Sequence, residues 1–268
     1  IWQMTNFVTQ NLEGEALEPG LPPAADLDLP ARWIVSRMTK LIAGVQRLFD
    51  SYQYGEAGRQ IDDFLWGEFA DWYIEISKHA LYQGDAQAKA STRRVLLAVL
   101  DTSLRLLHPF MPFVTEELWG FLPNTGGKPL IVSGWATADE SYIDEQAETE
   151  TGLLIELVRG IRNVREEYNV EPGRRITALI VPGSRPALFQ THDYLFARLC
   201  NVATIHLLSA DDAAPEHAAS VIVGDVTVYL PLADFMDVAA ECERLSKERD
   251  KLLEQIARVQ AQLSNEQF

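Results

Sequence analysis

Residues 104–119 have the sequence LRLLHPFMPFVTEELW, a mostly apolar stretch that contains two prolines. A proline inside a helix removes a hydrogen-bond donor and costs about 3 kcal/mol. Because the residue before a proline disfavours the helical conformation, His108 is expected to end one helix. Pro112 suits the first turn of the next helix, where a missing N–H costs little. The stretch therefore predicts a corner between two helices, with His108 as a structural residue at the end of the first.

Segments with apolar residues at helical spacing lie on both sides of this corner. A helix end at residues 1–11 and a linker rich in Gly, Pro and acids at 12–29 precede them. Each apolar face needs another to cover it, so we expect residues 1–136 to form one helical bundle. The expected helices cover residues 29–52, 56–81 after a break at Gly55, 86–107 and 113–122, and LIVSGW at 130–135 is expected to be a short strand.

The pattern changes after the acid-rich residues 137–151, and residues 137–233 predict a small α+β domain. Its expected elements are a helix at 147–168, strands at 176–183 and 203–209 with a helix at 185–199 between them, and a hairpin at 220–232 around Gly224 and Asp225. Mainly α structure is therefore expected overall.

The tail, residues 234–268, contains no glycine or proline and has apolar residues at coiled-coil spacing. It predicts the first helix of a coiled coil that stops before its partner helix, with Arg249 as the one charged member of its seam. The seam positions are Val238, Cys242, Leu245, Arg249, Leu252, Ile256, Val259 and Leu263.

The composition excludes some classes of protein and leaves others open. With 47% hydrophobic and 23% charged residues, the chain can bury a core. No apolar run approaches the roughly 18 residues of a membrane span, so no membrane partner is expected. The two cysteines, Cys200 and Cys242, form no CxxC pair and indicate free thiols in a reducing compartment. The net charge of −16 argues against a nucleic-acid partner, although a global sum can hide a local basic patch.

Residues for catalysis or metal binding are missing from the sequence. No histidine has the HxGH spacing, and no lysine lies in a KMSKS-like loop, the two elements that bind ATP in class I synthetases. GGKP at 126–129 lacks the earlier glycine and the Ser/Thr of a phosphate-binding loop and is interpreted as a turn. Glu116 and Glu117 are neighbours on a helix and point apart, so they do not form a catalytic pair. We expect no catalytic residue and no metal site.

Segments along nearly the whole chain, in order, resemble class I aminoacyl-tRNA synthetases. The corner and ARWIVSRM at 31–38 resemble segments shared by the enzymes for valine, isoleucine, leucine and methionine. The stretches FLWGEFADWYIEISK at 64–78 and IRNVREEYNVEPGRRI at 161–176, with the final LSNEQF, are similar to segments of the valine-specific members. The isoleucine-specific members would end in CxxC pairs, which this chain lacks, so the resemblance favours the valine-specific enzymes.

The resemblance implies the tRNA-binding, C-terminal part of an enzyme that attaches valine to its tRNA using ATP and magnesium. The catalytic and editing domains would lie before Ile1, which is itself not a start Met. The catalytic domain would be an intramolecular partner and valine tRNA the external one. We expect the fragment itself to be inactive, without cofactor, monomeric and cytoplasmic. Two alternatives remain: the same region of a sister synthetase, or a bundle and coiled-coil scaffold that binds proteins.

The resemblance also implies that the bundle receives the anticodon. Unpaired bases are bound by stacking on aromatic rings and by hydrogen bonds to their edges. Asn6 stands where family members often have an arginine, so the contact that this arginine would make with the tRNA is weakened here. Trp33 has the alternative role of a packing anchor, and Arg37 that of a solvated charge. The candidate anticodon-binding residues are Asn6, Phe7, Arg32, Trp33 and Arg37.

Two further groups of basic residues complete the candidates. The resemblance implies that the coiled coil touches the outer corner of the tRNA, although such charge runs are usually only a solvated helix face. The candidates on the tail are Arg244, Lys247, Arg249, Lys251 and Arg258. A second stripe consists of Arg159, Arg162, Arg165, Arg174 and Arg175, for which we favour packing within the molecule.

Overall fold

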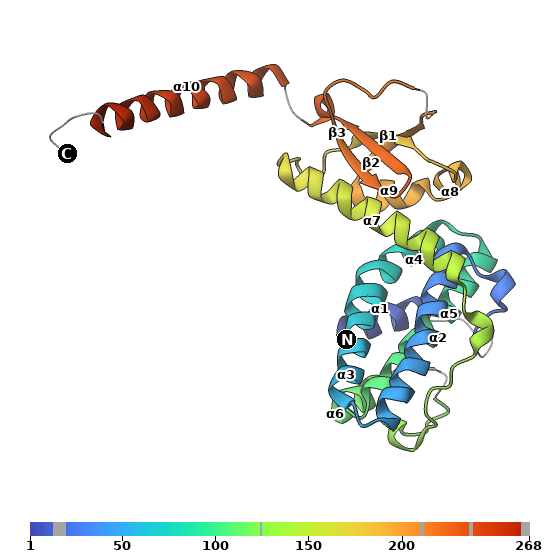
Figure 1. The fold of residues 1–268 in the computed structure, drawn as a ribbon. Helices are drawn as coiled ribbons and strands as arrows, with labels where there is room; N and C mark the ends of the chain where they lie inside the picture. Colours follow the sequence, from blue (N-terminus) through green and yellow to red (C-terminus); the bar gives the residue numbers. More distant parts are fainter. Residues whose placement is uncertain (13–19, 124, 210–211, 236–237, 264–268) are drawn as a thin grey trace. The chain divides into compact units, whose positions relative to one another are not determined.

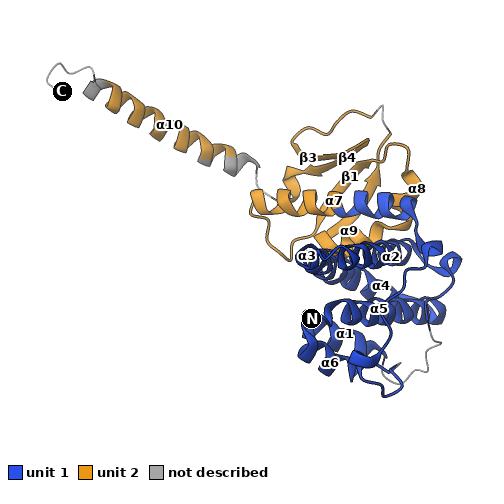
Figure 2. Ribbon diagram, turned by 60° about the horizontal axis from the view of Figure 1, so that its bottom comes forward, with its two compact units in different colours: residues 1–155 blue, residues 156–268 orange. Residues whose placement is uncertain are grey.

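The structure, a computed structural model, describes residues 1–12, 20–123, 125–209, 212–235 and 238–263. Helices dominate, and one four-stranded sheet follows them, which confirms the expected fold class (Figure 1). The chain forms two compact units, residues 1–155 and 156–268 (Figure 2). The units meet within one helix rather than at 136/137, so the sequence-based domain limit stays a prediction. None of the described helices is both long and apolar enough to cross a membrane.

The first unit is a helical bundle whose centre is α2, with buried residues along most of its length. Asp28 caps α2, because its carboxylate accepts a hydrogen bond of 2.9 Å from the Ala31 N–H. All the helices expected in this part of the chain are present. Their bounds are α1 Trp2–Leu12, α2 Leu29–Asp50, α3 Tyr54–Phe64, a π-helical segment Leu65–Tyr73, α4 Ile74–Gln83, α5 Ala86–Leu107 and α6 Pro112–Trp119.

The corner between α5 and α6 is confirmed, with Pro112 in the first turn of α6. The expected reason for the end of α5 was wrong in one respect, because His108 keeps helical angles (φ −54°, ψ −41°) although a proline follows it. The His108 Nδ1 lies 2.8 Å from the Thr115 Oγ1, and that hydroxyl donates to the Met111 carbonyl. His108 therefore ties the two helices together.

The strand expected at 130–135 is wrong, because Leu130–Val132 forms a short 3₁₀ turn. The Glu116 carboxylate accepts hydrogen bonds from the N–H groups of Leu130 (2.7 Å) and Ile131 (3.1 Å). These donors are the groups that a neighbouring strand would need. The Trp119 Nε1 also donates to the Lys128 carbonyl at 2.9 Å. The side chains of α6 thus hold this segment as a loop.

The turn between α2 and α3 also differs from the expected break at Gly55, which lies inside α3. Tyr52 makes the turn instead, with a φ of 60° that non-glycine residues rarely adopt. The Gln53 N–H donates to the Leu48 carbonyl and the Tyr52 N–H to the Phe49 carbonyl. This pair of bonds is the Schellman ending of a helix, in which glycine usually holds the place of Tyr52.

The second unit contains the sheet, in the order β2-β1-β4-β3. Strands β1 and β2 are parallel, and the other pairs are antiparallel. The hairpin at Gly224 is confirmed, but the helix expected at 185–199 is two helices that meet at His192. The bounds are α7 Glu145–Glu167, which begins in the first unit, β1 Ile176–Val181, α8 Pro186–Thr191, α9 Asp193–Cys200, β2 Val202–Leu207, β3 Ala218–Val223, β4 Val226–Pro231 and α10 Val238–Leu263.

One face of the sheet is buried, because alternate residues of β1 and β4 point into the core of the unit. Ile180, Val228 and Val221 lie side by side in the register of three strands. A side chain at Gly160 would clash with Val221, so this glycine lets α7 approach β3 closely. Helix α7 therefore covers the buried face of the sheet.

Candidate functional site

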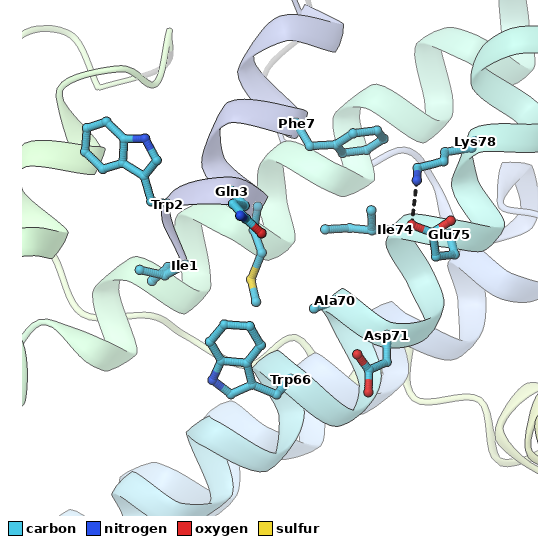
Figure 3. Close-up of a pocket in the computed structure, with 11 residues that line it drawn as sticks. Ile1, Trp2, Gln3, Phe7, Trp66, Ala70, Asp71, Ile74, Glu75 and Lys78 are labelled. Atoms are coloured by element: carbon cyan, nitrogen blue, oxygen red, sulfur yellow. Dashed lines mark hydrogen bonds and ion pairs between the residues drawn. The ribbon is translucent and has the colours of Figure 1, made fainter.

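A pocket of about 500 Å³ opens between α1 and the helical run from the π-helical segment to α4 (Figure 3). Both walls belong to the first unit. Its lining includes aromatic rings, a carboxylate, an amide and an ion pair. The lining residues are Ile1, Trp2, Gln3, Met4, Phe7, Trp66, Ala70, Asp71, Ile74, Glu75 and Lys78.

The first wall is α1, an amphipathic helix. Its residues Met4, Val8 and Leu12 are buried and fix it to the bundle. Trp2 and Phe7 are not on this buried stripe, so they remain partly open to solvent. The Trp2 ring also packs edge-on against Phe121, with 5.9 Å between the ring centroids. The helix therefore presents the rings of Trp2 and Phe7 to the pocket.

The opposite wall depends on the π-helical segment Leu65–Tyr73. Hydrogen bonds in a π-helix join residues five apart, and such turns occur often at functional sites. Phe69, Trp72 and Tyr73 enter the core and hold the segment in place. Trp66 and Asp71 are themselves five residues apart and both line the pocket. The wide turn therefore sets an indole and a carboxylate on one face.

Exposed aromatic surface is the main property of the pocket. Trp2 is 48% exposed and Trp66 is 52% exposed, although such large rings usually lie deeper in a fold. The Lys78 Nζ lies 5.5 Å from the centroid of the Phe7 ring, a cation–π contact, and also pairs with Glu75. Flat rings beside polar groups suit the stacking of planar, partly polar ligands such as nucleic-acid bases. Across the described ranges, no cluster of side chains is suited to holding a metal ion.

The five candidate anticodon residues do not converge on one place. Phe7 lines the pocket, and Asn6, the residue before it on α1, is exposed. Trp33 is only 4% exposed and is packed among the helices of the bundle. Its indole offers no open face to a base, which favours the alternative role of packing anchor. Base stacking by Trp33 stays a prediction, and its burial counts against it.

The two candidate arginines of α2, Arg32 and Arg37, form ion pairs within the first unit. Arg32 bonds Asp144 at 3.0 Å. Arg37 makes two hydrogen bonds to Glu68, of 2.8 and 2.7 Å, and lies 3.6 Å from Glu148. These carboxylates raise the pKa of Arg37 above its usual value, with the Glu68 hydrogen bond as the main cause. A phosphate would have to compete with these carboxylates for either guanidinium group.

A third cation joins the same network. Lys40 contacts Glu145 at 2.7 Å and Glu148 at 2.8 Å, and these bonds raise its pKa. The Ser36 hydroxyl donates to Glu148, whose side chain is only 14% exposed. The network therefore joins α2 to the start of α7. The acidic residues Asp144, Glu145 and Glu148 serve as the partners of the basic side chains of α2.

The tail candidates belong to α10, in the second unit, and none of them is among the residues that line the pocket. Lys247 pairs with Glu243 at 2.7 Å, and Arg249 bonds Asp250 at 2.6 Å. Lys251 and Arg258 are exposed, and the side chain of Arg244 lies outside the described part of the chain. The described pairs are short-range contacts along the helix surface, as in a solvated helix.

The second basic stripe has a structural use that agrees with packing within the molecule. Arg165 is nearly buried and donates to the carbonyls of Glu171, Pro172 and Arg174. Arg162 donates to the Leu199 carbonyl at 2.8 Å. These arginines therefore hold the turn after α7 and the end of α9.

Sequence reasoning missed most of the pocket. Trp2, Trp66, Asp71 and Lys78 were not among the candidates, although all four line the pocket. Trp66 is about half exposed, whereas Trp72 of the same segment is buried. One signal was available, because Trp66 lies off the apolar stripe at helical spacing. A tryptophan outside such a stripe has no place in the core.

The first unit is thus a helical bundle with an open aromatic pocket and a corner between α5 and α6 that contains two prolines. The family described as the anticodon-binding domain of tRNA ligases matches residues 31–180, and the chain belongs to this family.

Relatives along the whole chain are valine–tRNA ligases. The protein of that name from Enterococcus faecalis is 40% identical over 277 residues, which cover 100% of this chain and 30% of the relative. Those from Dehalococcoides mccartyi and Clostridium acetobutylicum are 41% and 37% identical, again over 100% of this chain and 31% and 30% of their own length. The chain thus spans about a third of the length of these relatives.

Proposed function

We propose that this chain is the tRNA-binding, C-terminal part of a valine–tRNA ligase, and that the pocket at Phe7 and Trp66 receives an unpaired anticodon base. The observation that carries the proposal is the pair of half-exposed tryptophans, Trp2 and Trp66, around one pocket in a domain of this family. Exposed apolar rings of this kind are unfavourable in water, and a group of them often marks the site where a ligand or partner binds.

The acidity of the chain sets the expected mode of binding. With a net charge of −16, general attraction to phosphate cannot supply most of the affinity. Arg32, Arg37 and Lys40 are bound to carboxylates. Stacking should therefore dominate at this site, with a weak dependence of affinity on salt.

Binding of a hairpin RNA with the anticodon loop of valine tRNA tests the proposal, by fluorescence anisotropy at two salt concentrations. Loss of a stacking ring typically costs about 1–3 kcal/mol per base. Trp66→Ala and Phe7→Ala should each weaken binding to this degree. Phe113→Ala is the matched control, because this ring is 90% exposed on α6 and outside the pocket.

Two results would contradict the proposal. If wild-type protein does not bind the hairpin better than an unrelated one, the rival function of a protein-binding scaffold is favoured. If Phe113→Ala weakens binding of the hairpin as much as Trp66→Ala and Phe7→Ala do, the pocket is not the specific site of binding.

The complete enzyme would attach valine to its tRNA in the cytoplasm, using ATP and magnesium on a catalytic domain outside this chain. Since the sequence has neither ATP-binding motif, the isolated chain should not activate valine. Valine-dependent exchange of pyrophosphate into ATP, measured with the purified chain, should stay at the blank level. Exchange above the blank would overturn this part of the proposal.

A further inference from the structure

We infer that Asp71 selects among bases at the pocket, favouring bases that carry an exocyclic amino group over uracil. The inference rests on the proposed function, and it adds the chemical class of base that the pocket prefers. It depends on the polar groups of the pocket rather than on its aromatic walls.

Asp71 is the polar group of the lining that is best placed to discriminate. Its side chain is exposed and lines the pocket beside Trp66 and Ile74 (Figure 3). Among the residues drawn in Figure 3, the marked interaction is that between Lys78 and Glu75, which neutralise each other. The Gln3 amide can both donate and accept, so it does not distinguish one base edge from another.

The chemistry of a carboxylate gives the direction of selection. An ionised carboxylate only accepts hydrogen bonds. Adenine, cytosine and guanine each carry an amino group that can donate to it, and Asp and Glu read the amino group of cytosine in this way. Uracil has two carbonyl oxygens at its edge and one ring N–H. Its oxygens would face the negative charge of Asp71, so binding of uracil should be weaker.

The π-helical turn brings the two parts of the proposed site together. Trp66 and Asp71 are separated by one turn of the segment Leu65–Tyr73. Both residues line the same pocket, so a base stacked on the Trp66 indole would lie in the space that Asp71 also lines.

The experiment uses hairpin RNAs that carry the anticodon loop of valine tRNA, with each anticodon base replaced in turn by uracil. Wild-type protein should lose about tenfold in affinity at one replaced position, the value of a good hydrogen bond to a base edge. Asp71→Asn should reduce this ratio to about threefold or less, because an amide can also donate to a uracil oxygen.

Asp62→Asn is the matched control, because Asp62 is an exposed acid of α3 outside the pocket and its change removes the same charge. If both variants raise the affinity for all the hairpins alike, Asp71 only repels phosphate and the inference is wrong. It is also wrong if Trp66→Ala weakens binding while Asp71→Asn leaves the uracil ratio unchanged. If Trp66→Ala has no effect on any hairpin, the proposed function itself fails.

Discussion

Two tryptophans of the bundle, Trp33 and Trp66, have opposite environments and should respond differently to mutation. Trp33 is 4% exposed, and its removal would leave a cavity in the core. Trp33→Ala should lower the free energy of unfolding by about 3–5 kcal/mol, measured by urea denaturation. Trp66→Ala should change this quantity by far less, because about half of the ring already contacts water. A small effect of Trp33→Ala would contradict its role as an anchor.

The two cysteines also differ in their environment. Burial raises the pKa of the Cys200 thiol to about 12, whereas Cys242 is exposed on α10. The thiolate is the reactive form, so Cys200 should remain protonated and unreactive at pH 8. Iodoacetamide should label Cys242 alone, as read by mass spectrometry of the digested protein.

The raised pKa of Cys200 should also make the stability of the protein depend on pH. Because the pKa of Cys200 is raised in the folded protein, this thiol ionises more easily in the unfolded chain. The free energy of unfolding should therefore fall as the pH rises above 9, the ordinary pKa of the thiol. Cys200→Ala should lessen this fall, while Cys242→Ala should not. Rapid labelling of Cys200 in native protein would show that α9 opens readily.

Individual residues show where sequence patterns are sufficient and where they are not. The buried face of the helical stretch at residues 56–81 was predictable, because Ile61, Phe69 and Trp72 follow helical spacing. The ion-pair partners of Arg32 and Arg37 were not predictable, because Asp144 and Glu148 lie more than a hundred positions away in the chain. Only tertiary contacts decide whether an arginine meets a carboxylate or a phosphate.

Among the elements, the end of α2 has a residue that is poorly suited to its backbone conformation. Tyr52 has a φ of 60° and is 80% exposed. A left-handed conformation costs a non-glycine residue about 1 kcal/mol or more, and glycine adopts it without this cost. Tyr52→Gly should therefore raise the free energy of unfolding by about 1 kcal/mol.

Tyr52→Phe provides the comparison, because it keeps the strained backbone and the ring. Its stability should match that of the wild type in the same denaturation experiment. If Tyr52→Gly is destabilising, the contact between the Tyr52 and Tyr54 rings, with centroids 6.3 Å apart, outweighs the backbone strain.

The loop after α6 shows how an element can be misjudged from its sequence. LIVSGW has the composition of a strand, and the sequence alone predicted one. Glu116 binds its N–H groups instead, from a distance of 14 and 15 residues. Helix positions follow from periodic spacing, but a strand also needs a partner that no local pattern identifies. The hairpin at Gly224 was predictable because its partner is adjacent.

At the level of the whole molecule, the tail α10 exposes an apolar stripe. Leu245, Leu252, Ile256 and Val259 are each 50–53% exposed along the seam that the sequence predicted. Residues 264–268 lie outside the described part of the chain. A single helix in water gains little from propensity alone, and an uncovered apolar stripe tends to associate. The tail should therefore either fray or pair with a second copy.

Arg249 decides between these outcomes. It lies in the seam, so a parallel dimer would bring two guanidinium groups together in place of an apolar layer. We expect a mostly monomeric chain in sedimentation equilibrium, with fast amide exchange from Leu245 to Val259. Arg249→Leu would complete the apolar seam and should produce a concentration-dependent dimer with slower exchange. Lys251→Leu, which removes a charge outside the seam, should stay monomeric. A stable dimer of the wild-type chain would contradict the prediction and would show that the tail tolerates Arg249 in its interface.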